Sequence, residues 1–355
     1  MASLFIIGNG FDLAHGLKTR YEDFHKYLNI LINKLNDELE DKKALEFLIE
    51  VIDDVERLDG YIEDYKWSNL EESLNFLDFT EFLEDFNAYY TLYGNKELEN
   101  LEDSYDEDYK YYDDEEYHGL LTCTSEGVES LSYKLDYRKN KKIQEYVKIL
   151  EEDENQILNL NQEKSLKILS YCSYLYKYFS EWINTIELDS SIKAKKDFYK
   201  LINFKESIFI NFNYTKTLEH LYRINPQKIC YIHGVQNGEM FFGHGNNGNI
   251  IDYTTYVGCE DTIEEIYEYL RKDTEKVIAK NKKFFNSLSG NTDKIYSFGF
   301  SFSEVDLIYI KKICKSIKTE DVTWYINDYD ENKGYRHIIK ACGFKGEISV
   351  FKVKE

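Results

Sequence analysis

Short apolar runs that end in glycine or polar residues recur along the chain, and they constrain its fold more than any other feature. One of them, LFIIGNG, starts at Leu4, and helical patterns separate several of the others, for example at 261–288 and 303–318. The later runs are SIFINFNYT, KICYIHG, EMFFGHG, DKIYSFGFSFSEVD, DVTWYIND and EISVFKV. Strands that alternate with helices predict a parallel α/β sheet, and continuous apolar runs indicate strands buried on both faces.

The predicted sheet is split in sequence, because LFII lies far from the next apolar run at Ser207. We therefore predict a discontinuous α/β domain of residues 1–40 and 200–355, with helices on both faces of the sheet. Residues 41–199 form a helical, acidic insertion. Its helical patterns run to about Asp59, then over 70–93, 141–150 and 162–186.

The insertion contains an unusually acidic segment, residues 97–118. It holds eleven acidic residues, one lysine and five tyrosines. Such a charge run favours a solvated, self-repelling loop. The interleaved tyrosines leave a second interpretation open, a segment that docks a partner or inhibits the protein itself.

Charge and composition exclude several classes of protein. The formal net charge is −22, and a nucleic-acid binder usually presents a basic face instead. No apolar segment has the length of a membrane span, and the first apolar run is too short for a signal peptide, so we expect a cytoplasmic protein without membrane contact. The six cysteines are scattered without C-x-x-C spacing, so no metal site is expected.

Polar residues gather where the predicted strands end, which is where open parallel sheets bind ligands. These residues are Gly8, Asn9, Gly10, Asp12, Asn211, Asn213, Thr215, His233, Gly299, Ser301, Ser303, Asn327 and Asp328. Amides, hydroxyls and glycines with one histidine suit the ribose hydroxyls of a nucleotide. His244, which lies among glycines in FGHG, is a further candidate for ligand contact.

The first strand, its glycine turn and the helix expected after it together predict a phosphate cradle. Asp12 or Thr19 is the expected cap of that helix. The fingerprint G-x-G-x-x-G is absent because Leu13 takes the place of the third glycine, and no G-K-[ST] motif occurs.

In this order, the blocks IIGNGFDLAHGLKTRYEDF, NFNYTKTLE, IHG, GHG and SFGFSFSEVD resemble the phage abortive-infection proteins of the AbiH family. The same blocks resemble the sirtuin-like, Rossmann-type NAD-binding fold. This resemblance implies that Asn213 and His233 are catalytic. It also implies NAD contacts at Gly8, Asn9, Gly10, Asp12, Asn211, Thr215, Gly299, Ser301 and Asn327.

The zinc-binding cysteine quartet of sirtuins is missing, so protein deacylation is not expected. The resemblance therefore implies an NAD glycohydrolase that serves anti-phage defence by depleting NAD. The alternatives are a non-catalytic sensor of NAD or ADP-ribose and an ADP-ribosyltransferase that uses the same site. A toxic NADase must be held inactive, so we expect a homo-oligomer or a partner defence protein, together with a phage-derived trigger.

Overall fold

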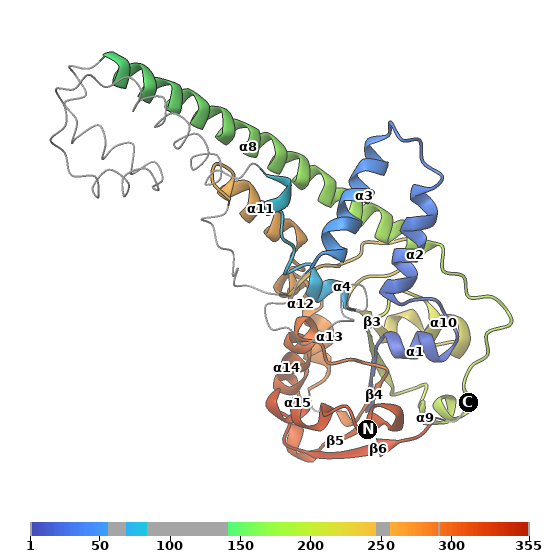
Figure 1. The fold of residues 1–355 in the computed structure, drawn as a ribbon. Helices are drawn as coiled ribbons and strands as arrows, with labels where there is room; N and C mark the ends of the chain where they lie inside the picture. The colour runs from blue at the N-terminus through green and yellow to red at the C-terminus, as the bar shows by residue number, and fades with distance from the viewer. Residues whose placement is uncertain (1, 56–68, 84–140, 246–255, 290–291, 354–355) are drawn as a thin grey trace. The chain divides into compact units, whose positions relative to one another are not determined.

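The computed structural model describes residues 2–55, 69–83, 141–245, 256–289 and 292–353 (Figure 1). The strands are β1 (Ala2–Ile7), β2 (Ile208–Asn211), β3 (Ile229–Tyr231), β4 (Thr292–Phe298), β5 (Thr323–Asn327) and β6 (Glu347–Phe351). The helices are α1 (Asn9–Ala14), α2 (Tyr21–Ile32), α3 (Glu40–Asp53), α4 (Leu70–Ser73), α8 (Lys141–Asn184), α9 (Lys196–Leu201), α10 (Thr217–Tyr222), α11 (Glu260–Leu270), α12 (Thr274–Lys280), α13 (Lys282–Ser287), α14 (Leu307–Ser316) and α15 (Tyr335–Ala341). Short 3₁₀ turns are η1 (Thr80–Phe82), η3 (Pro226–Lys228), η5 (Glu304–Asp306), η6 (Thr319–Asp321) and η7 (Asp328–Asp330). The acidic segment 97–118 lies outside the described residues.

Within the described residues, the strands form one six-stranded parallel sheet in the order β3-β2-β1-β4-β5-β6. The register places Leu4 of β1 opposite Ile208 of β2 and opposite Ile295 of β4. The remaining pairs, β2 with β3, β4 with β5 and β5 with β6, are also parallel. The predicted α/β class with a parallel sheet is confirmed.

Both faces of the sheet are buried. Alternate residues of β1 point to opposite faces, and each set packs into its own core. Leu4 and Ile6 belong to a core that includes residues of α12, α13, α14 and α15. Phe5 and Ile7 belong to a second core, formed with α1, α9 and α10 (Figure 1). All four side chains are fully buried, and each contributes about 1.5–3 kcal/mol through removal of apolar surface from water.

The chain divides into two compact units. The first comprises Met1–Leu77, Tyr171–Asn249 and Tyr267–Glu355 and contains the whole sheet. The second comprises Asp78–Ser170 and Ile250–Ile266. These boundaries differ from residues 40 and 200, and whether 41–199 forms a separate domain stays a prediction.

The second unit has its own polar contacts. Asn161 Nδ2 on α8 donates to the carbonyl of Val257 at 3.0 Å, and Gln162 Nε2 donates to Thr262 Oγ1 at 2.9 Å. Tyr256 also donates its hydroxyl hydrogen to Asp78 Oδ1 at 3.1 Å. The first two bonds join the part of α8 that lies in this unit to the start of α11 and to the residues just before it. Among the described residues, no helix has both the length and the apolar character needed to cross a membrane.

Two local predictions were wrong. EMFFGHG forms no strand, because Met240 makes only a single bridge to Gly234 and the backbone turns at Gly243, where φ is +138°. The helical pattern expected over 70–93 ends at Ser73 within the described residues. The helical pattern predicted over 261–288 is confirmed, and it consists of three helices, α11 to α13.

The expected helix caps were also wrong. Gly8 occupies the N-cap position of α1, and Asp12 lies inside that helix. Arg20 is the N-cap of α2, where its backbone N–H donates to Asp23 Oδ2 at 3.2 Å. The Thr19 hydroxyl donates instead to Asn9 Oδ1 at 2.5 Å. The Asp12 carboxylate likewise bonds to side chains of another segment, the hydroxyls of Thr215 and Thr217.

Candidate functional site

The carboxyl ends of β1 and β4 define the place where this sheet is expected to hold a ligand. The strand order reverses there, since β2 and β3 lie on one side of β1 and β4 to β6 lie on the other. Ligands of open parallel sheets bind at such reversal points. The polar residues that follow β1, β2, β3 and β4 are therefore the first to consider.

The glycine turn after β1 packs directly on the turn after β4. The N–H of Gly8 donates to the Phe298 carbonyl at 3.1 Å, and the N–H of Gly10 donates to the Gly299 carbonyl at 2.9 Å. A Cβ added at Gly8 would lie 2.5 Å from Gly299 O, so the two backbones meet without room for side chains. Both N–H groups are already used within the protein, and a pyrophosphate would need donors elsewhere.

Three of the predicted ligand residues lie apart from the polar clusters described below. Asn9 is exposed, and its Nδ2 donates to the Thr19 carbonyl at 2.9 Å. Ser301 is exposed on the segment after β4. Asn327 is buried, and its Oδ1 accepts the N–H of Tyr329 at 3.2 Å, which caps η7. The roles predicted for these residues stay predictions.

Asp12 lies in a buried polar cluster with residues of the segment after β2. Its carboxylate accepts hydrogen bonds from the hydroxyls of Thr215 and Thr217, at 2.5 and 2.7 Å. Asn213 Nδ2 donates to the Gly8 carbonyl at 3.0 Å, and the backbone N–H of Asn213 donates to Asn211 Oδ1 at 3.2 Å. The structure thus joins four predicted residues, Asp12, Asn211, Asn213 and Thr215, next to the glycine turn.

Burial raises the pKa of Asp12 from its ordinary value of 3.8 to about 6, although the Thr215, Thr217 and Asn213 side chains oppose the rise. The folded state therefore binds a proton on Asp12 more tightly than the unfolded state does. This contribution to stability is fully present below the unfolded pKa and is lost as the pH rises through the folded value. At neutral pH the buried charge costs about 3 kcal/mol relative to acid pH.

Asp12→Asn is accordingly expected to gain stability relative to the wild type as the pH rises from about 4 to 7. The gain approaches about 3 kcal/mol, since one pKa unit corresponds to 1.36 kcal/mol. Urea denaturation of both proteins at a series of pH values measures it. Parallel stability curves over this range would contradict the assignment of a raised pKa to Asp12.

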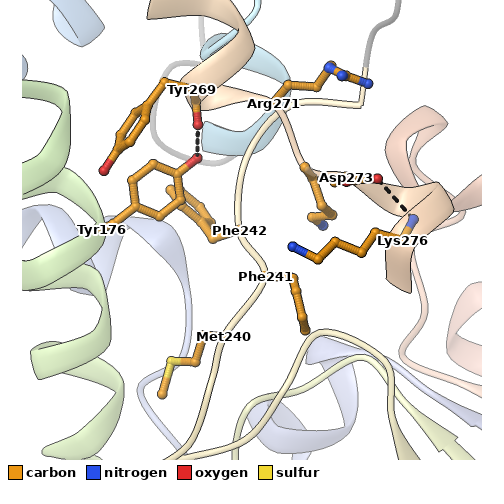
Figure 2. Close-up of a pocket in the computed structure, with 9 residues that line it drawn as sticks. Tyr176, Met240, Phe241, Phe242, Tyr269, Arg271, Asp273 and Lys276 are labelled. Carbon is orange, nitrogen blue, oxygen red and sulfur yellow. Dashed lines mark hydrogen bonds between the residues drawn. The ribbon is translucent and has the colours of Figure 1, made fainter. Parts of the chain in front are cut away.

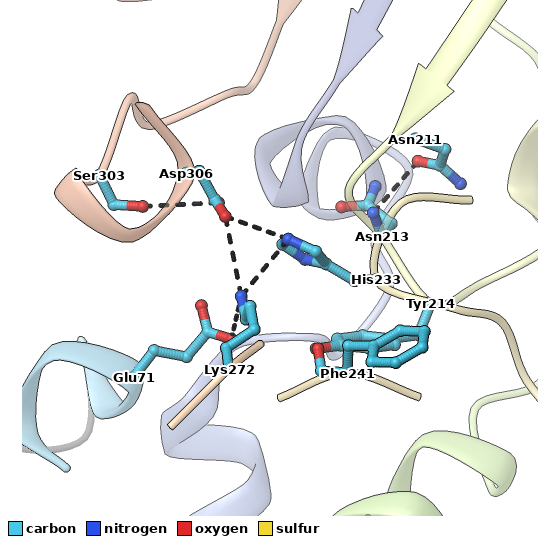
Figure 3. A network of polar contacts seen from close by, with 9 residues as sticks. All are labelled: Glu71, Asn211, Asn213, Tyr214, His233, Phe241, Lys272, Ser303 and Asp306. Carbon is cyan, nitrogen blue, oxygen red and sulfur yellow. Dashed lines mark hydrogen bonds and ion pairs between the residues drawn. The ribbon is translucent and has the colours of Figure 1, made fainter. Parts of the chain in front are cut away.

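His233 lies in a second buried cluster, beyond the carboxyl end of β3 (Figure 3). Its Nε2 lies 3.0 Å from Asp306 Oδ1 and 3.4 Å from Lys272 Nζ. Lys272 Nζ lies 2.6 Å from Glu71 Oε1 and 3.7 Å from Asp306 Oδ1. Side-chain exposure is 5% for His233, 9% for Asp306, 10% for Glu71 and zero for Lys272. We call these four residues the charged cluster.

The charge on Asp306 decides which imidazole nitrogen of His233 donates. Burial raises the pKa of Asp306, but His233 and Lys272 together outweigh burial and hold that pKa below its ordinary value. An ionised carboxylate can only accept, so Nε2 of His233 carries a hydrogen and donates it to Asp306. In the neutral imidazole Nδ1 then holds the lone pair and is the basic atom.

Aromatic rings surround His233. Phe212, Tyr214 and Tyr309 have ring centroids 5.2, 6.1 and 5.8 Å from the imidazole. Phe212 and Tyr214 flank Asn213, which ties the two polar clusters together. The buried hydroxyl of Tyr309 has no hydrogen-bond partner among the described residues. Such an unpaired group costs about 1–3 kcal/mol, and it calls for a bound water or ligand as an explanation.

His244 is buried next to Lys272. Its backbone N–H donates to the Leu270 carbonyl, and its own carbonyl accepts the N–H of Lys272 at 2.8 Å. Its Nε2 lies 2.9 Å from the Tyr267 carbonyl, so Nε2 is the donor and Nδ1 is an acceptor without a partner in the described chain. Burial lowers the pKa of His244, which keeps the ring neutral. His244 thus orders the backbone that carries Lys272.

Sequence reasoning missed three residues of the charged cluster. Asp306 lies within SFGFSFSEVD, and a signal existed because it follows the strand-end residue Ser303, whose hydroxyl lies 3.5 Å from Asp306 Oδ2. Lys272 lies between α11 and α12 in LRKDTEK, which looks like an ordinary surface sequence. Glu71 begins no recognisable motif. In the part of the chain that is described, His, Cys and carboxylate side chains form no group of three or more that could hold a metal ion.

The comparison with known proteins agrees with the blocks that carry these residues. A family model described as bacteriophage abortive infection AbiH matches residues 4–174 and 162–328. No curated protein and no solved structure matches the chain. The matched ranges include the glycine turn, Asn213, His233, Lys272 and Asp306, and they span most of the chain. The chain belongs to the AbiH family of bacteriophage abortive-infection proteins.

Proposed function

We propose that the protein is an NAD glycohydrolase that acts in abortive infection and converts NAD and water to nicotinamide and ADP-ribose. The observation that carries the proposal is the buried His233–Asp306 pair beyond the strand ends of a sheet in the order 3-2-1-4-5-6. That order is the one found in dinucleotide-binding folds. Family membership supports the role in abortive infection.

The chemistry requires only a few groups. The bond between C1′ of the ribose and the nicotinamide nitrogen breaks, and nicotinamide leaves as a neutral molecule. The oxygen of a water molecule forms the new bond to C1′, and its proton passes to Nδ1 of His233 and then to solvent. Asp306 orients the imidazole and stabilises the imidazolium that forms.

Asn213 supplies the polar contact to the reacting sugar in this proposal. Its amide is held by the Gly8 carbonyl through Nδ2, which leaves Oδ1 to accept from a ribose hydroxyl or from the attacking water. A neutral amide adds no charge next to an oxocarbenium-like centre. The other predicted NAD contacts, including His244, belong to the same proposal.

The decisive experiment follows the products of NAD incubated with the purified full chain. His233→Ala is expected to lower the rate at least about a hundredfold, which is the usual contribution of a general base. His220→Ala is the matched control, because His220 lies exposed on α10, between β2 and β3, and outside the charged cluster. Asp306→Asn, which preserves shape, is expected to lower the rate as well. Equal product from wild type and His233→Ala would remove His233 from the mechanism.

Other outcomes lead to the alternatives. Tight binding of NAD without turnover would indicate a sensor of NAD or ADP-ribose. ADP-ribose attached to a macromolecule, detected by mass spectrometry, would indicate a transferase. Because a toxic NADase must stay inactive before infection, we also propose that the chain is gated by a phage-derived trigger, by homo-oligomer formation or by a partner defence protein.

A further inference from the structure

A cavity of about 240 Å³ lies against Lys272. Figure 2 labels the other residues that line it. Three segments of the first unit form its walls: α8 contributes Tyr176, the segment after β3 contributes residues 240–242, and the stretch from Tyr269 to Lys276 closes it. Lys272 lines the cavity and also touches His233 and Asp306. The cavity therefore borders the charged cluster, and nothing above gives it a role.

One cation of the cavity, Lys276, forms no ion pair with a carboxylate in the described part of the chain. Arg271 is paired with Glu268 at 2.6 Å, and Lys272 is matched by Glu71 and Asp306. Among the described residues, no ion pair reaches the ammonium group of Lys276. Asp273, the acidic residue of the lining, accepts the backbone N–H of Lys276 at 2.9 Å. Lys276 helps to lower the pKa of exposed Glu239, but an anion that entered this cavity would still meet its positive charge at Nζ.

The opposite walls are aromatic and already ordered. Tyr176 donates its hydroxyl hydrogen to the Tyr269 carbonyl at 3.0 Å, and the two rings meet edge to face at 5.3 Å (Figure 2). Phe242 is fixed by stacking on Phe179 at 4.2 Å. Tyr269 remains 44% exposed, and Phe241 is partly exposed. The ammonium group of Lys280 lies over the Phe241 ring at 5.1 Å, so the other face of that ring and the exposed Tyr269 ring are the surfaces able to stack on planar groups such as nucleobases.

We propose that this cavity binds the phosphate-bearing nucleoside part of a nucleotide, with the phosphate on Lys276 Nζ and the base against Phe241 and Tyr269. The glycine-turn N–H groups of Gly8 and Gly10 are already bonded, so the phosphates need another donor. A volume of about 240 Å³ is below the usual range for a whole ligand, so it suits one half of a dinucleotide. The identification of that dinucleotide as NAD rests on the proposed function.

Calorimetric titration of the full chain with ADP, adenosine and inorganic pyrophosphate tests the proposal. ADP is expected to bind more tightly than either of its parts. Lys276→Ala is expected to raise the Kd for ADP about tenfold and to leave that for adenosine unchanged, since only a charged hydrogen bond is lost. Lys283→Ala is the matched control, because Lys283 is exposed on α13 and does not line the cavity. The proposal would be overturned if ADP did not bind, or if the Kd for ADP were equal in Lys276→Ala and Lys283→Ala. It would also be overturned if pyrophosphate bound the wild type as tightly as ADP does.

Turnover of NAD separates this proposal from the proposed function. If both hold, Lys276→Ala acts on the KM for NAD rather than on kcat, because it removes binding that ground and transition states share. If ADP binding depends on Lys276 but the wild type releases no nicotinamide, the cavity stands and the glycohydrolase does not. If NAD turns over with the same KM in Lys276→Ala, the glycohydrolase stands and the cavity is not its nucleotide site.

Discussion

Replacing Gly299 by alanine is expected to lower the free energy of unfolding by about 3 kcal/mol or more. Gly299 has a φ of +63°, which L-residues rarely adopt, and its added Cβ would lie 2.3 Å from Phe11 N and 2.4 Å from Gly10 C. Backbone atoms on both sides of the contact cannot rotate away, so the turn after β4 and the start of α1 must shift apart. Chemical denaturation of the wild type and the variant measures the loss.

Gly334→Ala separates the two causes of that loss. Gly334 also has a positive φ, +77°, but an added Cβ there meets nothing within 4 Å. Its replacement is expected to cost only about 1 kcal/mol, the cost of the backbone conformation alone. A similar loss in both variants would mean that the contact between the glycine turns adds nothing to stability.

The glycine turns illustrate how far sequence reasoning reached. The run before Gly8 identified a buried strand correctly, because apolar and β-branched residues bounded by glycine have few other uses. The glycines also have a use that was not predicted, since the chain needs them for a contact with Gly299, far along the sequence. A single sequence gives no sign of such a partner. EMFFGHG failed for a related reason, because Phe242 is buried although this segment pairs with no strand among the described residues.

Some residues of the candidate site could likewise be predicted from the sequence, and others could not. Asn213 and His233 follow strands, and the rule that parallel strands end at one edge brings them near one another. Lys272 follows α11 instead, at a break in the helical pattern between Leu270 and Thr274. Lysine is almost always exposed, so composition predicts a surface position for it. Its burial depends on Glu71 and Asp306, two carboxylates that tertiary structure alone brings to it.

The side chains of the charged cluster depend on one another, because each buried charge needs its partners. Each carboxylate would be costly to bury alone, and the ammonium group of Lys272 lies within 4 Å of both. His233 takes part only through Asp306 and Lys272, so the geometry of the proposed base depends on a residue outside every strand-end motif. Loss of the ammonium group should therefore disturb the fold and the site together.

Lys272→Met is expected to lower the free energy of unfolding by about 3–5 kcal/mol at neutral pH. Methionine fills the space of the lysine stem, but Glu71 and Asp306 would then face one another as buried carboxylates without their cation. In the wild type, the lowered pKa of Asp306 contributes stability that is present above its unfolded pKa and lost as the pH falls below that value. In the variant, burial is offset by His233 alone, so Asp306 takes up a proton at higher pH.

The difference in stability between Lys272→Met and the wild type should accordingly shrink as the pH falls from about 7 to 5, because protonation removes the unpaired charge. Adding Glu71→Gln to Lys272→Met should restore part of the loss at neutral pH. Lys280→Met is the matched control: its partner Glu239 and its own side chain are both more than half exposed, so it should cost less than about 1 kcal/mol. A loss at Lys272 as small as that at Lys280, or one that does not change with pH, would mean that the four side chains do not act as one charged cluster.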